Sequence, residues 1–145
     1  MLRCLALLAL APLTSLAAVI AVNEPWVRPA PVGTSTLAFM ELAVSEPATL
    51  IDVRTPVAAK VALGRGKQRQ APPFALPLAA KETLVMRDAG THIVLERVER
   101  TLKRGERVPL TLVLRYADGT TQEVQVDAEV RRRSPTDDHR GAHRH

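Results

Sequence analysis

Cysteine is almost absent from this chain of 145 residues, whose single cysteine, Cys4, lies close to the N-terminus. The body of the chain therefore has no thiolate metal site, no cysteine nucleophile and no disulfide. A metal ion bound there would need histidine, methionine, carboxylate or backbone ligands.

Motifs of catalysis are missing as well. The sequence contains no H-E-x-x-H pair, no glycine loop for phosphate and no recognisable Ser-His-Asp arrangement. Its carboxylates are scattered singly, which is usual for a solvated surface. We therefore expect a protein that is not an enzyme.

Helical periodicity of useful length is also lacking, and short alternating apolar segments cut by Pro and Gly take its place. About eight such segments predict an all-β fold, an antiparallel Greek-key β-sandwich. In the last predicted hairpin the turn is Asp118-Gly119. The expected strands are Leu37–Val44, Leu50–Val53, Val61–Leu63, Thr83–Arg87, His92–Val98, Leu110–Tyr116 and Val124–Val130.

The N-terminus has the pattern of a signal peptide. A basic start at Arg3 precedes the apolar run Leu5–Leu13, and small residues follow it. We expect residues 1–21 to form this segment, with cleavage near residues 18–21, and residues 22–130 to form one domain. The apolar run is too short for a stable membrane span. The predicted location is the periplasm.

Positive charge exceeds negative charge, with a formal net charge of +5. Basic side chains gather at Lys60–Arg69, Arg97–Arg107 and Arg131–Arg133. Solvated faces explain all three clusters, and an anionic lipid surface or an acidic partner is the alternative. Because an exported protein does not meet nucleic acid in the cell, nucleic acid is not expected as a partner.

Residues 131–145 form a polar segment rich in His and Arg, which we predict to be a disordered tail. Three imidazoles there, on His139, His143 and His145, lie beside two aspartates and are candidate ligands for Cu(II), Zn or Ni. Two neighbouring arginines argue against tight binding. A merely solubilising tail is the alternative.

Four segments together resemble the PCuAC family of periplasmic copper chaperones. They are Glu24–Pro31 (EPWVRPAP), Leu37–Met40 (LAFM), Thr55–Leu63 (TPVAAKVAL) and Asp88–Leu114, which contains GTHIVL and LKRGERVPLTL. The resemblance covers about Val22 to Val130 and implies a cupredoxin-like β-sandwich. It also implies copper as the cargo, and a cuproenzyme or another copper-delivery protein as the partner.

The copper ligands that the family pattern implies are mostly missing. Gly64 stands in place of the first His, the loop between Gly64 and Met86 has no Met, and Val94 stands in place of the last Met. His92 alone remains, and one imidazole cannot hold Cu(I), which takes two to four ligands. Met86, six residues earlier, is a candidate replacement, whereas Met40 belongs to an apolar strand and is expected in the core.

Two hypotheses remain open. The first is a periplasmic protein that binds copper or delivers it to a cuproenzyme. The second is a family member without a core metal site, which acts as a protein-binding module and docks through the basic Lys60–Arg69 segment.

Overall fold

The protein is a curled β-sheet structure in the computed structural model, which describes residues 18–134. Ten strands and no helix occur in this range, so the described part contains no helix that could cross a membrane. The strands are β1 (Ile20–Val27), β2 (Thr36–Val44), β3 (Ala48–Arg54), β4 (Ala58–Arg65), β5 (Gln68–Gln70), β6 (Leu76–Leu78), β7 (Thr83–Val85), β8 (Thr91–Val98), β9 (Arg107–Tyr116) and β10 (Thr121–Val130).

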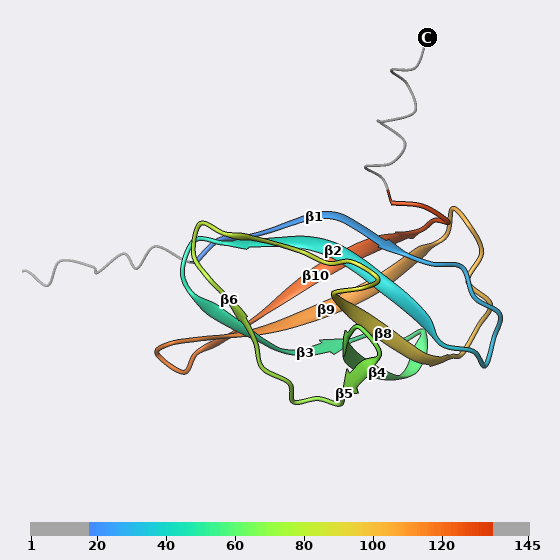
Figure 1. Ribbon diagram of the computed structural model, residues 1–145, viewed down its shortest axis with the longest axis horizontal. Helices are drawn as coiled ribbons and strands as arrows, with labels where there is room; N and C mark the ends of the chain where they lie inside the picture. Colours follow the sequence, from blue (N-terminus) through green and yellow to red (C-terminus); the bar gives the residue numbers. More distant parts are fainter. Residues whose placement is uncertain (1–17, 135–145) are drawn as a thin grey trace, which may run out of the picture.

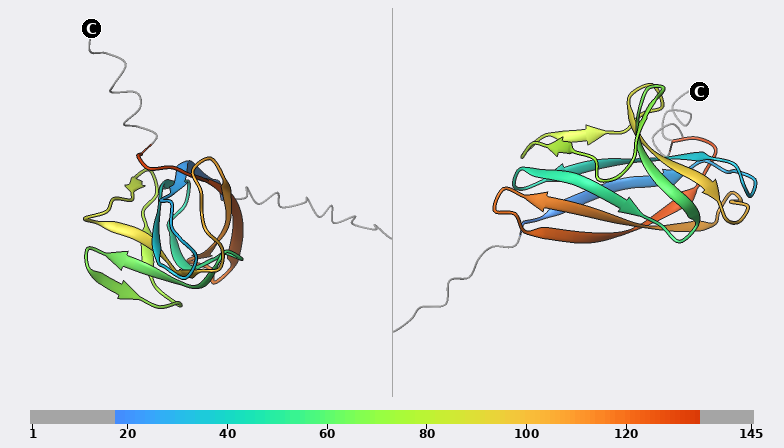
Figure 2. Two further views of the ribbon diagram at one scale, coloured as in Figure 1. Left: turned by 90° about the vertical axis from the view of Figure 1, so that its right-hand side faces the viewer. Right: turned by 90° about the horizontal axis from the view of Figure 1, so that it is seen from below.

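The strands form one sheet in the order β5-β4-β8-β2-β1-β10-β9-β3-β6, and β7 pairs with a further part of β2. The sheet curls so that its two halves face each other across the core (Figures 1 and 2). The all-β, cupredoxin-like prediction is confirmed. It needs one correction, because β1 and β10 run parallel while the other pairs are antiparallel. A parallel neighbour arises because β1 and β10 come from opposite ends of the chain and need no hairpin.

Three strands were not expected from the sequence. Strands β5 and β6 have three residues each, too few to show a period of two. Strand β1 begins at Ile20, which pairs with Val44, within the segment assigned by its composition to the signal peptide.

The final hairpin, β9–β10, is the most regular part of the fold. Nine consecutive residue pairs join the two strands. Inward-facing Leu110, Leu112 and Leu114 are completely buried, as the alternation of apolar and polar residues predicted. The expected turn is present, with Gly119 at a φ of +85°, a backbone conformation that glycine adopts without strain.

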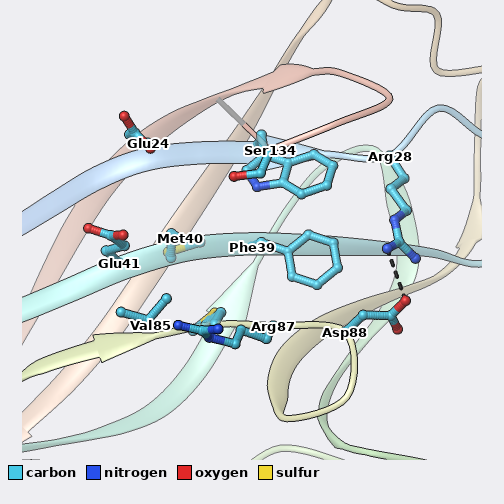
Figure 3. Close-up of a pocket in the computed structure, with 11 residues that line it drawn as sticks. Glu24, Arg28, Phe39, Met40, Glu41, Val85, Arg87, Asp88 and Ser134 are labelled. Atoms are coloured by element: carbon cyan, nitrogen blue, oxygen red, sulfur yellow. Dashed lines mark hydrogen bonds and ion pairs between the residues drawn. The ribbon is translucent and has the colours of Figure 1, made fainter. Parts of the chain in front are cut away.

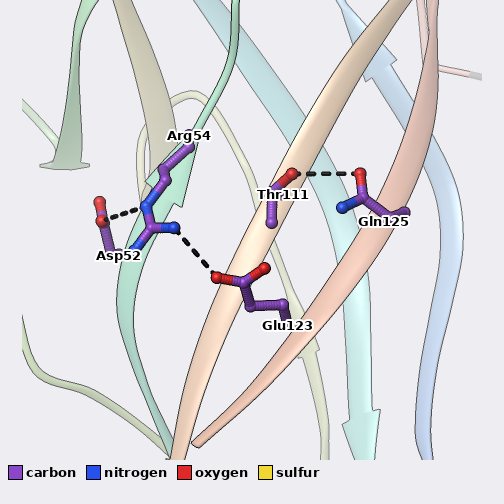
Figure 4. Close-up of polar contacts among 5 residues, drawn as sticks. All are labelled: Asp52, Arg54, Thr111, Glu123 and Gln125. Carbon is purple, nitrogen blue, oxygen red and sulfur yellow. Dashed lines mark hydrogen bonds and ion pairs between the residues drawn. The ribbon is translucent and has the colours of Figure 1, made fainter.

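The outward face of this hairpin carries polar side chains that reach across the strands. Arg54 of β3 bonds to Asp52 on its own strand and to Glu123 of β10, and Thr111 donates to the Gln125 side chain 3.1 Å away (Figure 4). These groups are exposed, so the hairpin has one buried and one solvated face.

The pair β4–β8 differs, because part of its second face is buried as well. Leu63 and Ile93 face the core, and the residues that follow and precede them, Gly64 and His92, are also buried on the other face. A turn at residues 87–91 closes over this second face, held by a bond from Gly66 N to Gly90 O of 3.0 Å. This covered face contains the candidate site.

Candidate functional site: the His92 row

The site is a row of side chains that crosses five strands on the covered face. Cross-strand pairing places Trp26 beside Phe39, His92 beside Gly64, and Gly64 beside Arg69. The Phe39 and His92 rings complete the row, with centroids 6.3 Å apart. Residues paired across strands share a face, so strands distant in sequence build one surface here.

The His92 ring is held by its Nδ1 atom. Nδ1 lies 3.1 Å from the carbonyl oxygen of Gly90 and 3.3 Å from that of Arg87. A carbonyl oxygen only accepts hydrogen bonds, so Nδ1 carries the proton and donates to both. In the uncharged ring Nε2 then bears the lone pair that can bind a metal ion. No buried side-chain nitrogen or oxygen between residues 18 and 134 lacks a partner, so Nε2 keeps contact with solvent.

Gly64 makes room for this ring. A Cβ atom placed on Gly64 would lie 2.1 Å from His92 Nε2 and 2.5 Å from its Cδ2. Real Cβ contacts are never this short, so any side chain at position 64 requires the ring to move. The imidazole therefore fills the space in which the family pattern places a second histidine.

The other ligand positions of the family are apolar or lack a side-chain donor. Val94, completely buried, pairs with Ala62 on one side and Leu37 on the other. Phe74, at the end of the Pro-rich loop, is buried and its N–H donates to Ile51 O. Aliphatic and aromatic side chains offer no donor to a metal. The described residues thus supply one imidazole at this place and do not form a closed copper site.

Met86 lies on the core side. Its N–H donates to Met40 O at 3.1 Å, which places it opposite Met40, whereas His92 lies beside Phe39, the residue before Met40. Side chains of successive strand residues point to opposite faces. Met86 and Met40 both pack in the hydrophobic core, as expected for Met40.

A pocket of about 390 Å³ lies beside the row (Figure 3). Trp26 and Phe39 stack on its floor with centroids 4.7 Å apart. The Arg28 guanidinium lies 5.0 Å from the Phe39 ring centroid and 3.0 Å from the Asp88 carboxylate. This cation–π contact and ion pair fasten the turn that covers His92 to β1.

Trp26, Phe39 and Arg28 were not predicted as site residues from the sequence. The signal was present, because the Trp-Val-Arg and Phe-Met segments carry part of the family resemblance. Only the pairing of β1 with β2 and of β2 with β8 shows that they extend the His92 row.

The tail histidines His139, His143 and His145 lie outside the described residues. Ser134, the last described residue, lines the pocket beside Trp26. Within residues 18–134 no group of three or more His, Cys, Asp or Glu side chains could hold a metal ion.

Comparison with known proteins decides the family. The model of the LpqE-like lipoprotein family matches residues 20–128, nearly the whole described domain. The chain belongs to the LpqE-like family. Among curated proteins, none matches it.

Solved PCuAC domains share the fold of this LpqE-like protein. The copper-bound PCuAC domain from PmoF2 is 25% identical, with a TM-score of 0.61 over 77% of this chain and 91% of that domain. Cu(I)-DR1885 from Deinococcus radiodurans is 29% identical, with a TM-score of 0.52 over 77% of this chain and 78% of that one. The apo PCuAC domain from PmoF1, at 21% identity and a TM-score of 0.64, supports the fold alone. The resemblance to PCuAC domains stated from the sequence is confirmed.

Proposed function

We propose that this LpqE-like protein handles copper outside the cytoplasm, as a PCuAC-type carrier that lacks the closed ligand set. The observation that carries the proposal is the orientation of His92, whose Nδ1–H is held by two carbonyls and whose Nε2 keeps its lone pair. Two similar structures solved with copper bound, the PmoF2 domain and Cu(I)-DR1885, support copper as the cargo.

His92 cannot hold the ion alone, so the proposal requires donors from outside the described domain. The imidazoles of His139, His143 and His145 are the available ones in this chain. On a tail that the sequence predicts to be disordered, these side chains would lose conformational freedom on converging on one ion, which lowers the affinity. A weakly held ion is also easily passed on, which suits delivery to a cuproenzyme.

A second function has its own support. The His92 ring fills the space beside Gly64, because a Cβ placed on Gly64 would lie 2.1 Å from His92 Nε2. Val94 is completely buried. These are features of a packed structural site. They favour a family member that has lost copper binding in the domain and acts as a binding module for another exported protein, with the Lys60–Arg69 segment as its docking surface.

Copper titration separates the two functions. The chain from residue 18 onward, which contains every described strand, is titrated with Cu(I) against a chelator and separately with Cu(II). It is compared with His92→Gln and with a triple variant of His139, His143 and His145 to Asn. Circular dichroism of each variant controls for folding.

If His92 and the tail share the ion, each variant loses affinity by at least tenfold. Because the tail imidazoles must be uncharged to coordinate, binding through the tail also weakens as the pH falls through about 6.5, the ordinary histidine pKa. Full affinity in His92→Gln with loss in the tail variant would show that the domain supplies no ligand to the ion. That result would favour the binding module. Tight one-to-one binding in both variants would contradict the proposed ligands.

A further inference from the structure

Three segments distant in sequence meet at one end of the sandwich. Backbone bonds join Ala30 to Leu102 in both directions at 3.2 and 2.8 Å, and Gly105 N donates to Val130 O at 2.9 Å. The loop after β1, the turn before β9 and the chain after β10 therefore form one platform, at the right of Figure 1 and toward the viewer in the left panel of Figure 2.

This platform carries concentrated positive charge, on Lys103, Arg104, Arg132 and Arg133. All four residues are exposed, and no ion pair of theirs is found among residues 18–134. Two carboxylates on the same end are already paired, Glu106 with Arg100 and Glu129 with Arg131 at 4.0 Å. Arg104, Arg132 and Arg133 line one shallow pocket, so their guanidinium groups can converge on one anionic surface.

Apolar groups border the charge. An adjoining groove is lined by Pro29, Pro31 and Leu102 together with the stems of the basic residues. Val32, at the tip of the loop, is 58% exposed although its N–H is fixed to the Thr101 hydroxyl at 3.2 Å. A rigid loop thus presents a large apolar side chain beside four cations.

We propose that this basic end, defined as Val32, Lys103, Arg104, Arg132 and Arg133, docks on the surface of a bilayer that contains anionic lipid. Guanidinium groups pair with the phosphates of the head groups, and Val32 enters the interface between head groups and acyl chains. Charge alone would also suit an acidic protein. The combination of unpaired cations with an exposed aliphatic tip fits a lipid surface better.

Along β8, His92 is separated from the basic end. Gly33 N donates to Val98 O at 2.8 Å, so the basic end lies at the end of β8. His92 lies six residues earlier on that strand, about 20 Å away at 3.3 Å per residue. The Trp26 end of the row lies nearer to the basic end, because Trp26 pairs with Glu129 and Ser134 lines the pocket beside Trp26.

Vesicle flotation tests the proposal with the chain from residue 18 onward. Vesicles of phosphatidylcholine alone are compared with vesicles of phosphatidylcholine and phosphatidylglycerol in equal parts. The test variant changes Arg104, Arg132 and Arg133 to Ser. The control changes Arg65, Lys67 and Arg115 to Ser, which removes the same charge from exposed positions elsewhere. Arg65 pairs with Thr91, about 23 Å along β8 from Val98 at the strand rise.

We expect binding to the anionic vesicles only. The partition coefficient should fall about a hundredfold in the test variant, since each surface arginine contributes about fivefold, and Val32→Ser should lower it severalfold. An equal loss in the control would reduce the effect to net charge and overturn the proposal. So would binding to neutral vesicles, or complete release by millimolar inorganic phosphate at constant ionic strength, which would indicate a site for the free anion.

Discussion

The β9–β10 hairpin and the β4–β8 pair have the same antiparallel strand geometry but differ in the solvent exposure of their outward faces. In the hairpin, outward residues such as Thr111 and Gln125 are solvated and make bonds at the surface. In β4–β8, the outward residues His92, Val94 and Ala62 are buried. One region is therefore constrained on a single face and the other on both.

The difference shows which positions of this fold restrict the choice of side chain. An exposed face accepts many polar side chains, whereas a face packed on a ring and a glycine accepts few. The family's metal positions lie on the doubly constrained pair. Gly64 and Val94, which stand at two of the positions that the PCuAC pattern assigns to ligands, therefore also belong to the packing of this face.

The largest effect should come from the inward positions, where the two regions are alike. Leu112→Ala in β9 and Leu63→Ala in β4 each remove a completely or almost completely buried side chain. Each should lower the free energy of unfolding by about 2–5 kcal/mol, measured by urea denaturation. A much smaller loss at Leu63 would mean that β4 is not part of the cooperative core.

Gly64→Ala should follow, at about 1–3 kcal/mol, because the new Cβ meets the His92 ring. The backbone of Gly64 is not in the left-handed region, so alanine itself fits the strand. In a His92→Ala background the same change should be nearly neutral, since the ring is gone. Additive costs in the double variant would show that the ring does not depend on Gly64.

Thr111→Ala, on the outward face of the hairpin, should change the free energy of unfolding by about 0.5 kcal/mol or less. Its bond to Gln125 is exposed, and water can replace it. A cost as large as that of Gly64→Ala would break the comparison between the two regions.

The smallest effect concerns the turn of the hairpin and depends on pH. Bonds from the Thr120 hydroxyl and N–H hold the pKa of Asp118 below its usual range. A lowered pKa in the folded state gives stability that is present at neutral pH and is lost as the pH falls through the folded value. Asp118→Asn should therefore flatten the acid side of the stability profile slightly, as followed by thermal unfolding between pH 2 and pH 6, roughly the range in which carboxylates titrate. An unchanged profile would show that the turn gains nothing from the charge.

Most of the fold could be predicted because local patterns and burial agree along the chain. The alternating leucines of β9 and the Asp118-Gly119 turn specify a hairpin without reference to the rest of the molecule. Strand β5 has three exposed residues, and the parallel contact of β1 with β10 joins segments about a hundred residues apart. Such pairings depend on how the sheet curls, which no local pattern encodes.

The candidate site was only partly predictable for the same reason. Sequence alone predicted that His92 is the one match left to the ligand pattern of the PCuAC family, and it determined that Gly64 and Val94 offer no donor, because donor chemistry belongs to the residue type. The tertiary structure determined how the space around Gly64 is filled. The register of β4 against β8 puts the His92 ring into the space of Gly64, and the turn at residues 87–91 fixes its proton on Nδ1. Distances between strands arise only when the sheet forms, so the sequence could single out His92 but could not show that its ring fills the space at Gly64.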